Sequence, residues 1–269
     1  MTQSSHTTTF FLAGGGRPIA ATFDDVVQTG APRTGTLIVP PFGWEAMCSH
    51  RARRDWARAL AASGSPALRI DLPAAGDSDG MPSDPDLLPA WIAAVDTAVH
   101  WLRGEGGCRR VAVIGIELGG ILAACATSAG TPVDDLVLWN VPARGRSLVR
   151  ELQAFSRFEG TPPPPDDDPA DGPAPDGTLV AGGYLMSAQT TAAVSAIDLS
   201  DGLAIAPATR VLLLGRDDRA PDRRLVEALE ASGCDLTTRP GLGYAAMTAE
   251  PVDAVPPRAT IDAVAQWLA

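Results

Sequence analysis

The chain has 269 residues, of which 45% are hydrophobic and 20% are charged, a composition typical of globular proteins and unlike disordered or collagen-like chains. All 21 basic residues are arginine, and 32 acidic residues bring the formal net charge to −11. This acidic balance argues against nucleic acid as a partner, and the lack of lysine excludes Schiff-base chemistry. Only three histidines are present, His6, His50 and His100.

The length predicts one α/β domain of ordinary size. The first 25 residues have no apolar core flanked by basic residues, so they do not form a signal peptide, and no apolar run is long enough to cross a membrane. We therefore expect a soluble, cytoplasmic protein that does not act at a membrane. The four cysteines lack the spacing of a metal site, so we expect no metal and no cofactor; they are Cys48, Cys108, Cys125 and Cys234.

The predicted elements begin with two apolar runs, 8–12 and 19–23, which a glycine-rich turn joins into an antiparallel hairpin. Short apolar runs then alternate with longer helical patterns. This alternation predicts an α/β fold, in which a mostly parallel sheet is flanked by helices. The strands are expected at 36–39, 67–70, 110–114, 136–139 and 210–214, and the helices at 50–62, 86–104, 118–128, 221–232 and 258–268.

One segment, 144–206, interrupts this alternation between two strands. We expect it to form a lid over a core built from 1–143 and 207–269. The lid should contain a helix at 145–157, an extended piece at 178–186 and a helix that ends at Ala196. Its stretch 160–177 is rich in proline and aspartate, a composition that buries too little apolar surface to fold, so it is predicted to be a mobile surface loop.

The most informative stretch runs from Gly115 to Gly119, with Glu117 at its centre, where an apolar strand passes directly into a helix of small residues. In a nucleophile elbow such a turn presents the central side chain above the sheet, and the next residue, here Leu118, donates a backbone N–H to an oxyanion hole. The stretch resembles the G-x-S-x-G elbow of the α/β-hydrolase superfamily, with glutamate in place of serine.

Three further segments resemble the same superfamily. The segment 71–78 resembles the loop after the fourth strand, 212–221 the strand and turn that hold the catalytic acid, and 240–247 the histidine loop. The resemblance implies that Asp218 is the catalytic acid, with its neighbour Asp217 as the alternative. It also implies that Tyr244 stands in the place of the catalytic histidine.

The oxyanion loop, 39–48, carries Pro-Pro-Phe-Gly where the superfamily normally has His-Gly. Together with 182–184 and 243–247, it resembles a branch that is found beside polysaccharide and natural-product genes and often lacks the elbow serine. The resemblance implies that Phe42 or Gly43 supplies the second oxyanion-hole N–H. The candidate substrate contacts are Trp44, Tyr184 and Met247, with core packing as the alternative explanation for Trp44.

A serine hydrolase mechanism is excluded because both the serine and the histidine are replaced. A covalent role for Glu117 would need a second base to activate water, and no histidine is placed to supply it. We therefore expect Glu117 to act as a general base that removes a proton next to a carbonyl, with the Phe42 and Leu118 amides holding the enolate oxygen. A leaving group on the next carbon makes the reaction an elimination. Superfamily members that expel acetate from an acetylated tetronate in polyketide antibiotic assembly carry out such a reaction, so the expected partner is a small acylated metabolite.

Other interpretations stay open at this point. Glu117 can pair with an arginine in a silent site, which would make the protein a binding partner in a biosynthetic cluster. Cys48, or water activated by Glu117, can serve an ester or thioester hydrolase or an acyltransferase. Glu45 and Arg51 are expected to form an ion pair that braces the oxyanion loop. Tyr244 can hydrogen-bond Asp218 or donate a proton, and the chain can be a monomer or a homodimer.

Overall fold

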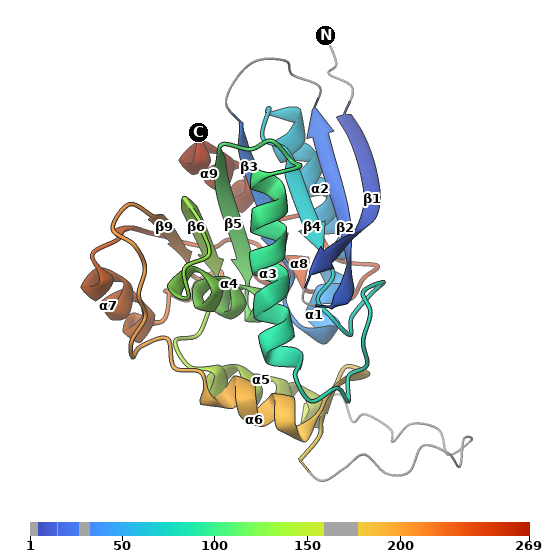
Figure 1. Ribbon diagram of the computed structural model, residues 1–269. Helices are drawn as coiled ribbons and strands as arrows, with labels where there is room; N and C mark the ends of the chain where they lie inside the picture. The colour runs from blue at the N-terminus through green and yellow to red at the C-terminus, as the bar shows by residue number, and fades with distance from the viewer. Residues whose placement is uncertain (1–4, 15, 27–32, 159–176) are drawn as a thin grey trace.

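The computed structural model describes residues 5–14, 16–26, 33–158 and 177–269. Its main sheet has the strand order β1-β2-β4-β3-β5-β6-β9-β10 (Figure 1). β1 and β2 form the expected antiparallel hairpin, β2 is antiparallel to β4, and all later neighbours are parallel. The strands are β1 (Ser5–Gly14), β2 (Arg17–Val26), β3 (Thr34–Val39), β4 (Ala67–Ile70), β5 (Arg110–Ile116), β6 (Asp135–Trp139), β9 (Arg210–Leu214) and β10 (Asp235–Arg239). The predicted fold class is confirmed.

Helices cover both faces of the sheet, which is why its central strands are apolar almost throughout. In β5, Val111 and Val113 belong to one core, whereas Ile114 and Ile116 belong to the other. The first core lies under α3 (Leu87–Arg103), α4 (Leu118–Ser128) and α7 (Arg223–Ser232), and the second under α2 (His50–Ala62) and α9 (Arg258–Leu268). Figure 1 shows α3 in front of the sheet and α2 behind it.

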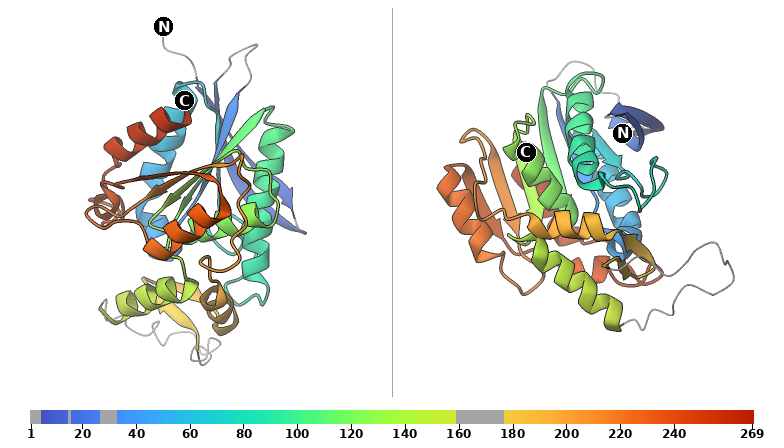
Figure 2. Two further views of the ribbon diagram at one scale, coloured as in Figure 1. Left: turned by 90° about the vertical axis from the view of Figure 1, so that its left-hand side faces the viewer. Right: turned by 60° about the horizontal axis from the view of Figure 1, so that its bottom comes forward.

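The segment 144–206 lies at the carboxyl ends of the parallel strands (Figure 1). It contains α5 (Gly145–Phe158), β7 (Leu179–Ala181), β8 (Tyr184–Met186) and α6 (Ala188–Ala196). The piece predicted as one extended segment is a hairpin, because Gly182 and Gly183 both have positive φ and turn the chain tightly. Figure 2 shows α5 and α6 packed side by side at this end. The predicted loop at 160–177 lies outside the described residues apart from Gly177.

The strand β10 and two short helices, α1 (Gly43–Cys48) and α8 (Tyr244–Met247), were not predicted. β10 is the edge strand beside β9 and has the sequence DLTTR. It lacks the apolar run that marks the other strands because its side chains are exposed or only partly buried. Within the described ranges, no helix is both long and apolar enough to cross a bilayer.

Candidate active site

Glu117 lies at the sharp turn between β5 and α4, with φ 50° and ψ −112°. A non-glycine residue in this left-handed region stores about 1–3 kcal/mol of strain, which the surrounding structure must hold. The turn is tight because the backbones are close: a Cβ atom on Gly119 would lie 2.4 Å from the Pro40 carbonyl oxygen. The strand and helix therefore fix the Glu117 side chain above the carboxyl end of the sheet.

The Glu117 side chain is almost completely buried, with 3% of the residue exposed. The Phe42 N–H donates a hydrogen bond to Glu117 Oε2 at 3.3 Å, and the Leu118 N–H lowers the pKa of this carboxyl. The resemblance assigns both amides to a substrate oxygen. In this structure the Phe42 amide instead binds the glutamate at the elbow, so this donor of the expected oxyanion hole is occupied by the protein's own side chain.

A second carboxyl, that of Glu45, reaches the same point from α1. The Glu45 side chain is close enough to Glu117 for a carboxyl–carboxyl hydrogen bond, and it accepts a hydrogen bond of 2.5 Å from the Tyr244 hydroxyl. The expected ion pair with Arg51 is wrong: Arg51 is exposed, and in the part of the chain that the structure describes it forms no ion pair with Glu45. Glu45 faces inward because α1 turns its first residues toward the elbow.

The two carboxyls change each other's proton affinity. Burial raises the pKa of Glu117 well above its ordinary value, and the neighbouring Glu45 raises it further. Burial also raises the pKa of Glu45, whereas the Tyr244 hydroxyl and the Arg216 charge lower it. Two carboxylates in contact repel each other when both are ionised. The pair therefore holds one proton above the pH at which an ordinary glutamic acid loses it, and the two groups titrate together.

Tyr244 is fully buried and held from three sides. Its ring meets the Trp139 ring edge-on, with centroids 5.3 Å apart, and the Arg216 guanidinium carbon lies 4.7 Å from the ring centroid. The Asp217 carboxylate accepts hydrogen bonds from the Gly243, Tyr244 and Ala245 amides at 2.6, 3.1 and 2.9 Å. Asp217 therefore fixes the start of α8 and directs the tyrosine toward Glu45.

Asp218 does not reach this network. It is exposed, and the acid that contacts the Tyr244 loop is its neighbour Asp217. The one-residue difference arises because the chain turns at Asp217, where φ is 51°, so the next side chain points to solvent. Met247 is also placed differently from the expectation: it is completely buried in the core with Trp139 and does not line a cavity next to the site.

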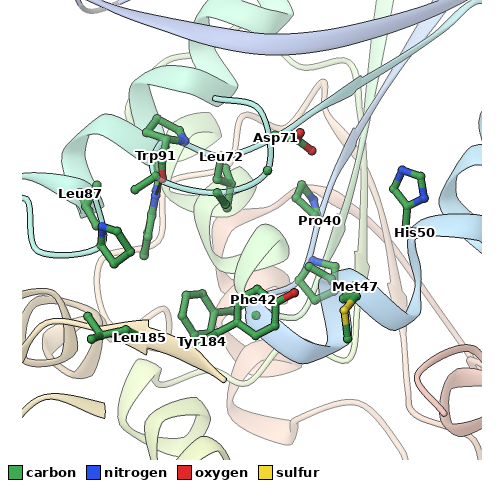
Figure 3. Close-up of a pocket in the computed structure, with 18 of the residues that line it drawn as sticks. Pro40, Phe42, Met47, His50, Asp71, Leu72, Leu87, Trp91, Tyr184 and Leu185 are labelled. Carbon is green, nitrogen blue, oxygen red and sulfur yellow. Dashed lines mark hydrogen bonds between the residues drawn. The ribbon is translucent and has the colours of Figure 1, made fainter. Parts of the chain in front are cut away.

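Two cavities lie near Glu117 and its hydrogen-bond donor Phe42. The elbow cavity, of about 230 Å³, contains Glu117 and is lined by polar and apolar groups from α5 and from the loops that follow β6 and β9. Besides Glu117, its charged lining residues are Glu151, Arg216, Arg219 and Asp222, and Asn140 adds a neutral polar group. The large cavity, of about 640 Å³, is mainly apolar and is lined in part by Phe42, whose amide contacts Glu117. Tyr184 lines it, as Figure 3 shows, so this predicted contact lies in a pocket.

Gly43 lines the large cavity, whereas Trp44 and Cys48 line neither cavity. Trp44 packs against Phe155 of α5, with ring centroids 6.5 Å apart, and its side chain closely approaches Gly182 of the hairpin. It joins the 144–206 segment to the core. Cys48 is 2% exposed at the end of α1 and lines neither cavity. In the described ranges no group of three or more His, Cys, Asp or Glu side chains could hold a metal ion.

Sequence reasoning missed three members of the site: Glu45 as a partner of Glu117, Arg216 above Tyr244, and Asn140 in the elbow cavity. A signal for Glu45 was present, because within the oxyanion loop it follows Phe42 by three residues, which is about one helical turn. No comparable signal marks Asn140, which follows β6 with a positive φ of 55°. Its place depends on the parallel pairing of β5 and β6.

A comparison with known families decides the membership of the chain: a model described as the alpha/beta hydrolase family matches residues 30–256. The chain belongs to the alpha/beta hydrolase family. A search of curated proteins found no match.

Solved structures share the alpha/beta hydrolase fold with this chain. Est1E from Butyrivibrio proteoclasticus, with ferulic acid bound, is 16% identical over 96% of this chain and 97% of its own, with a TM-score of 0.62. DcsB, in complex with its substrate analogue, is 16% identical over 98% and 99%, with a TM-score of 0.64. Brefeldin A esterase, a bacterial homologue of human hormone sensitive lipase, is 18% identical over 98% and 76%, with a TM-score of 0.63. At these identities the similarity concerns the fold.

Proposed function

We propose that this alpha/beta hydrolase acts on a small acylated metabolite, and that the Glu117–Glu45 carboxyl pair transfers the proton in an elimination that releases a carboxylate such as acetate. The observation that carries the proposal is the pair itself: a buried, strained glutamate at the elbow lies beside a second glutamate, and burial raises the pKa of both. Groups with strongly raised proton affinity concentrate at working sites.

The reaction has one proton and one leaving group to account for. The Glu117 carboxylate takes the proton from the carbon next to the substrate carbonyl. The electron pair of that C–H bond forms the new C=C bond, and the C–O bond to the acyloxy group breaks, so that this group leaves as a carboxylate. The proton then returns to solvent from the carboxyl pair. No oxidant and no water are consumed.

The elbow cavity supplies the charges that such a reaction needs. Arg216 and Arg219 line it together with Glu117, and a guanidinium can bind a carboxylate through two parallel hydrogen bonds. These arginines can therefore neutralise the enolate oxygen or the departing carboxylate. This assignment replaces the Phe42 amide, which is already bonded to Glu117.

The resemblance of the oxyanion loop to the natural-product branch supports a substrate of polyketide origin, for example an O-acetylated tetronate. In such a molecule the acetoxy group lies next to an acidic C–H bond, as the proposed reaction requires. The volume of the elbow cavity, about 230 Å³, suits an acetyl-sized group better than a long acyl chain.

Ester hydrolysis is the second reaction that the same geometry supports. Est1E and brefeldin A esterase, which share the fold, are esterases by name, and a pair of carboxyls that shares one proton can activate a water molecule. In that case water attacks the acyl carbon, whereas elimination leaves the acyl group unattacked. The two reactions therefore differ in the origin of the oxygen atoms in the released acid.

The experiment that separates them uses an O-acetylated tetronate in water enriched in ¹⁸O. Elimination should release acetate with no ¹⁸O, together with an unsaturated tetronate, and mass spectrometry measures both products. Acetate that carries one ¹⁸O, together with a deacetylated alcohol that carries none, would establish hydrolysis instead. Absence of turnover, with no shift of the melting temperature by the substrate, would support a silent binding partner.

Two variants identify the groups that act. Glu117→Gln should lose turnover, whereas Cys48→Ala should retain it because Cys48 lines neither cavity. Loss of activity in Cys48→Ala, with a covalent acyl-protein intermediate detected in the wild-type protein, would instead favour a thiol nucleophile. Asp218→Asn, at an exposed position outside both cavities, serves as the control for both variants.

A further inference from the structure

The large cavity has an apolar part and a polar part. Its apolar wall comes from the oxyanion loop, the loop after β4, α3 and the 182–186 turn, and includes Phe42, Leu72, Leu87, Trp91, Tyr184 and Leu185. The polar part is formed by His50 and Arg53 of α2 and by Asp71 and Asp77 of the loop after β4. In Figure 3, His50 and Asp71 lie toward one side of the cavity and Leu87, Trp91 and Leu185 toward the other.

Arg53 is the unusual member of this lining because it is a charged residue with only 4% of its surface exposed. Its Nε donates to Ser49 Oγ at 3.2 Å, and its Nη2 donates to the Ala46 carbonyl oxygen at 2.7 Å. A guanidinium has five N–H donors. Three of them therefore have no hydrogen-bond partner among the described residues.

The charge of Arg53 is also incompletely balanced. Among the described residues it forms no ion pair with a carboxylate, and its closest named countercharge, Asp71, uses one carboxylate oxygen to accept the Asp77 amide hydrogen bond at 3.1 Å. Burial lowers the pKa of Arg53 to about 10, and Asp71 offsets only part of this effect. A buried cation without a paired anion is costly, so an anion from outside would relieve it.

A carboxylate fits the polar part of the large cavity, beside Arg53, better than a neutral polar group does. A guanidinium presents two parallel N–H donors that match the two oxygens of a carboxylate. Away from Arg53, His50, Asp71 and Asp77 the lining is mainly apolar, so the rest of the bound molecule should be a hydrocarbon or aromatic chain that reaches from Arg53 toward Trp91. The large cavity meets the elbow site at Phe42, whose side chain lines the cavity and whose amide contacts Glu117.

We propose that the large cavity binds the non-reacting part of the substrate, an apolar chain that ends in a carboxylate paired with Arg53. This rests on the proposed function in taking the ligand to be the remainder of the acylated substrate. The predicted substrate class is therefore an acidic, lipid-like or polyketide-like molecule whose acyloxy group lies on the Glu117 side of Phe42.

The test measures binding without turnover. Decanoate and decanol are titrated into the protein by isothermal calorimetry, with Trp fluorescence as a second signal because Trp91 lines the cavity. Decanoate should bind at least about tenfold more tightly than decanol, the factor expected for one hydrogen bond to a charged group. Equal affinity of the two ligands for the wild-type protein overturns the proposal without any variant.

Variants then locate the bound carboxylate. Arg53→Met keeps much of the side-chain volume and should abolish the preference for decanoate while decanol binding is retained. Arg51→Met, which removes an exposed arginine from the same helix, should keep the preference. Ala75→Trp, at an exposed position of the cavity wall, should weaken the binding of both decanoate and decanol. Loss of the preference in Arg51→Met, or unchanged binding in Ala75→Trp, would place the carboxylate elsewhere.

The same titration distinguishes failure of this proposal from failure of the catalytic one. Glu117→Gln should bind decanoate with wild-type affinity, because Glu117 does not line the large cavity. If Glu117→Gln remains active but the preference for decanoate over decanol depends on Arg53, the carboxylate subsite is supported and the role of Glu117 as the base is excluded. If decanoate and decanol bind equally while Glu117→Gln is inactive, the reverse conclusion holds.

Discussion

The Tyr244 hydroxyl donates its hydrogen bond to Glu45, at 2.5 Å, and not to an aspartate. In the α/β-hydrolase pattern that the sequence resembles, the position of Tyr244 is occupied by a catalytic base that works with the acid after β9. Here that acid, Asp217, binds the backbone of the loop, and the tyrosine side chain is used to hold a glutamate. The site is thus organised around two carboxyls and no longer around an acid and a histidine.

Glu117→Gln should lower turnover by about 10²- to 10⁴-fold, the usual contribution of a general base. The amide keeps the size of the side chain and can still accept the Phe42 hydrogen bond, so the fold should be unchanged. Circular dichroism and steady-state kinetics measure the two effects. Full activity in this variant would exclude Glu117 as the base.

The free energy of unfolding should depend on pH through Glu117. Because its pKa is raised in the folded protein, the folded state binds this proton more tightly than the unfolded state does. The stability that it contributes is fully present below the unfolded pKa of about 4.5 and is lost as the pH rises through the folded value. Each unit of difference corresponds to about 1.4 kcal/mol.

Glu117→Gln cannot ionise, so it should become more stable than the wild type as the pH rises above about 4.5. Urea unfolding at a series of pH values measures this difference. Glu105→Gln, at an exposed position on the surface, is the matched control and should show a difference that does not change with pH. A constant difference for Glu117→Gln as well would mean that folding does not raise the pKa of Glu117.

Glu45→Gln should move the acidic limb of the pH–rate profile to lower pH. The negative charge of Glu45 raises the pKa of Glu117, so its removal lets Glu117 ionise more easily. The rate at neutral pH need not fall by the same factor as in Glu117→Gln. A profile identical to that of the wild type would show that the two carboxyls do not share a proton.

Asp217→Ala should destabilise the protein by about 1–3 kcal/mol, since three backbone amides lose a charged acceptor. The matched change Asp218→Ala removes an exposed carboxylate and should stay within about 0.5 kcal/mol of the wild type. Thermal unfolding compares the two. The reverse order would indicate that Asp218, as the family pattern implies, is the acid that supports the Tyr244 loop.

Much of the fold could be predicted from the sequence, because the hydrophobic pattern of each helix and each buried strand is a local property of the chain. The helices predicted at 50–62 and 118–128 have these bounds in the structure, and the strand at 210–214 does as well. The edge strand β10 was missed because a polar strand has no apolar run to detect. The elbow was found because glycines on both sides of Glu117 mark its close backbone approaches.

The site was predicted less completely, for reasons of geometry. The pairing of Glu45 with Glu117 and the contact of Arg216 with Tyr244 depend on how separate loops meet at the carboxyl end of the sheet, which no local pattern encodes. The choice between Asp217 and Asp218 depends on one positive φ value. Met247 fell into the core because α8 is a single turn that directs it toward Trp139.

Proton exchange at carbon tests the general-base role of Glu117 most directly. A tetronate analogue in which hydrogen replaces the acetoxy group cannot undergo elimination, but in D₂O a general base can still exchange the proton next to its carbonyl. NMR spectroscopy should show that the wild-type protein catalyses this exchange and that Glu117→Gln does so about 10²- to 10⁴-fold more slowly. Equal exchange rates in the two proteins would contradict a general-base role for Glu117. So would the absence of exchange in a wild-type protein that still releases acetate.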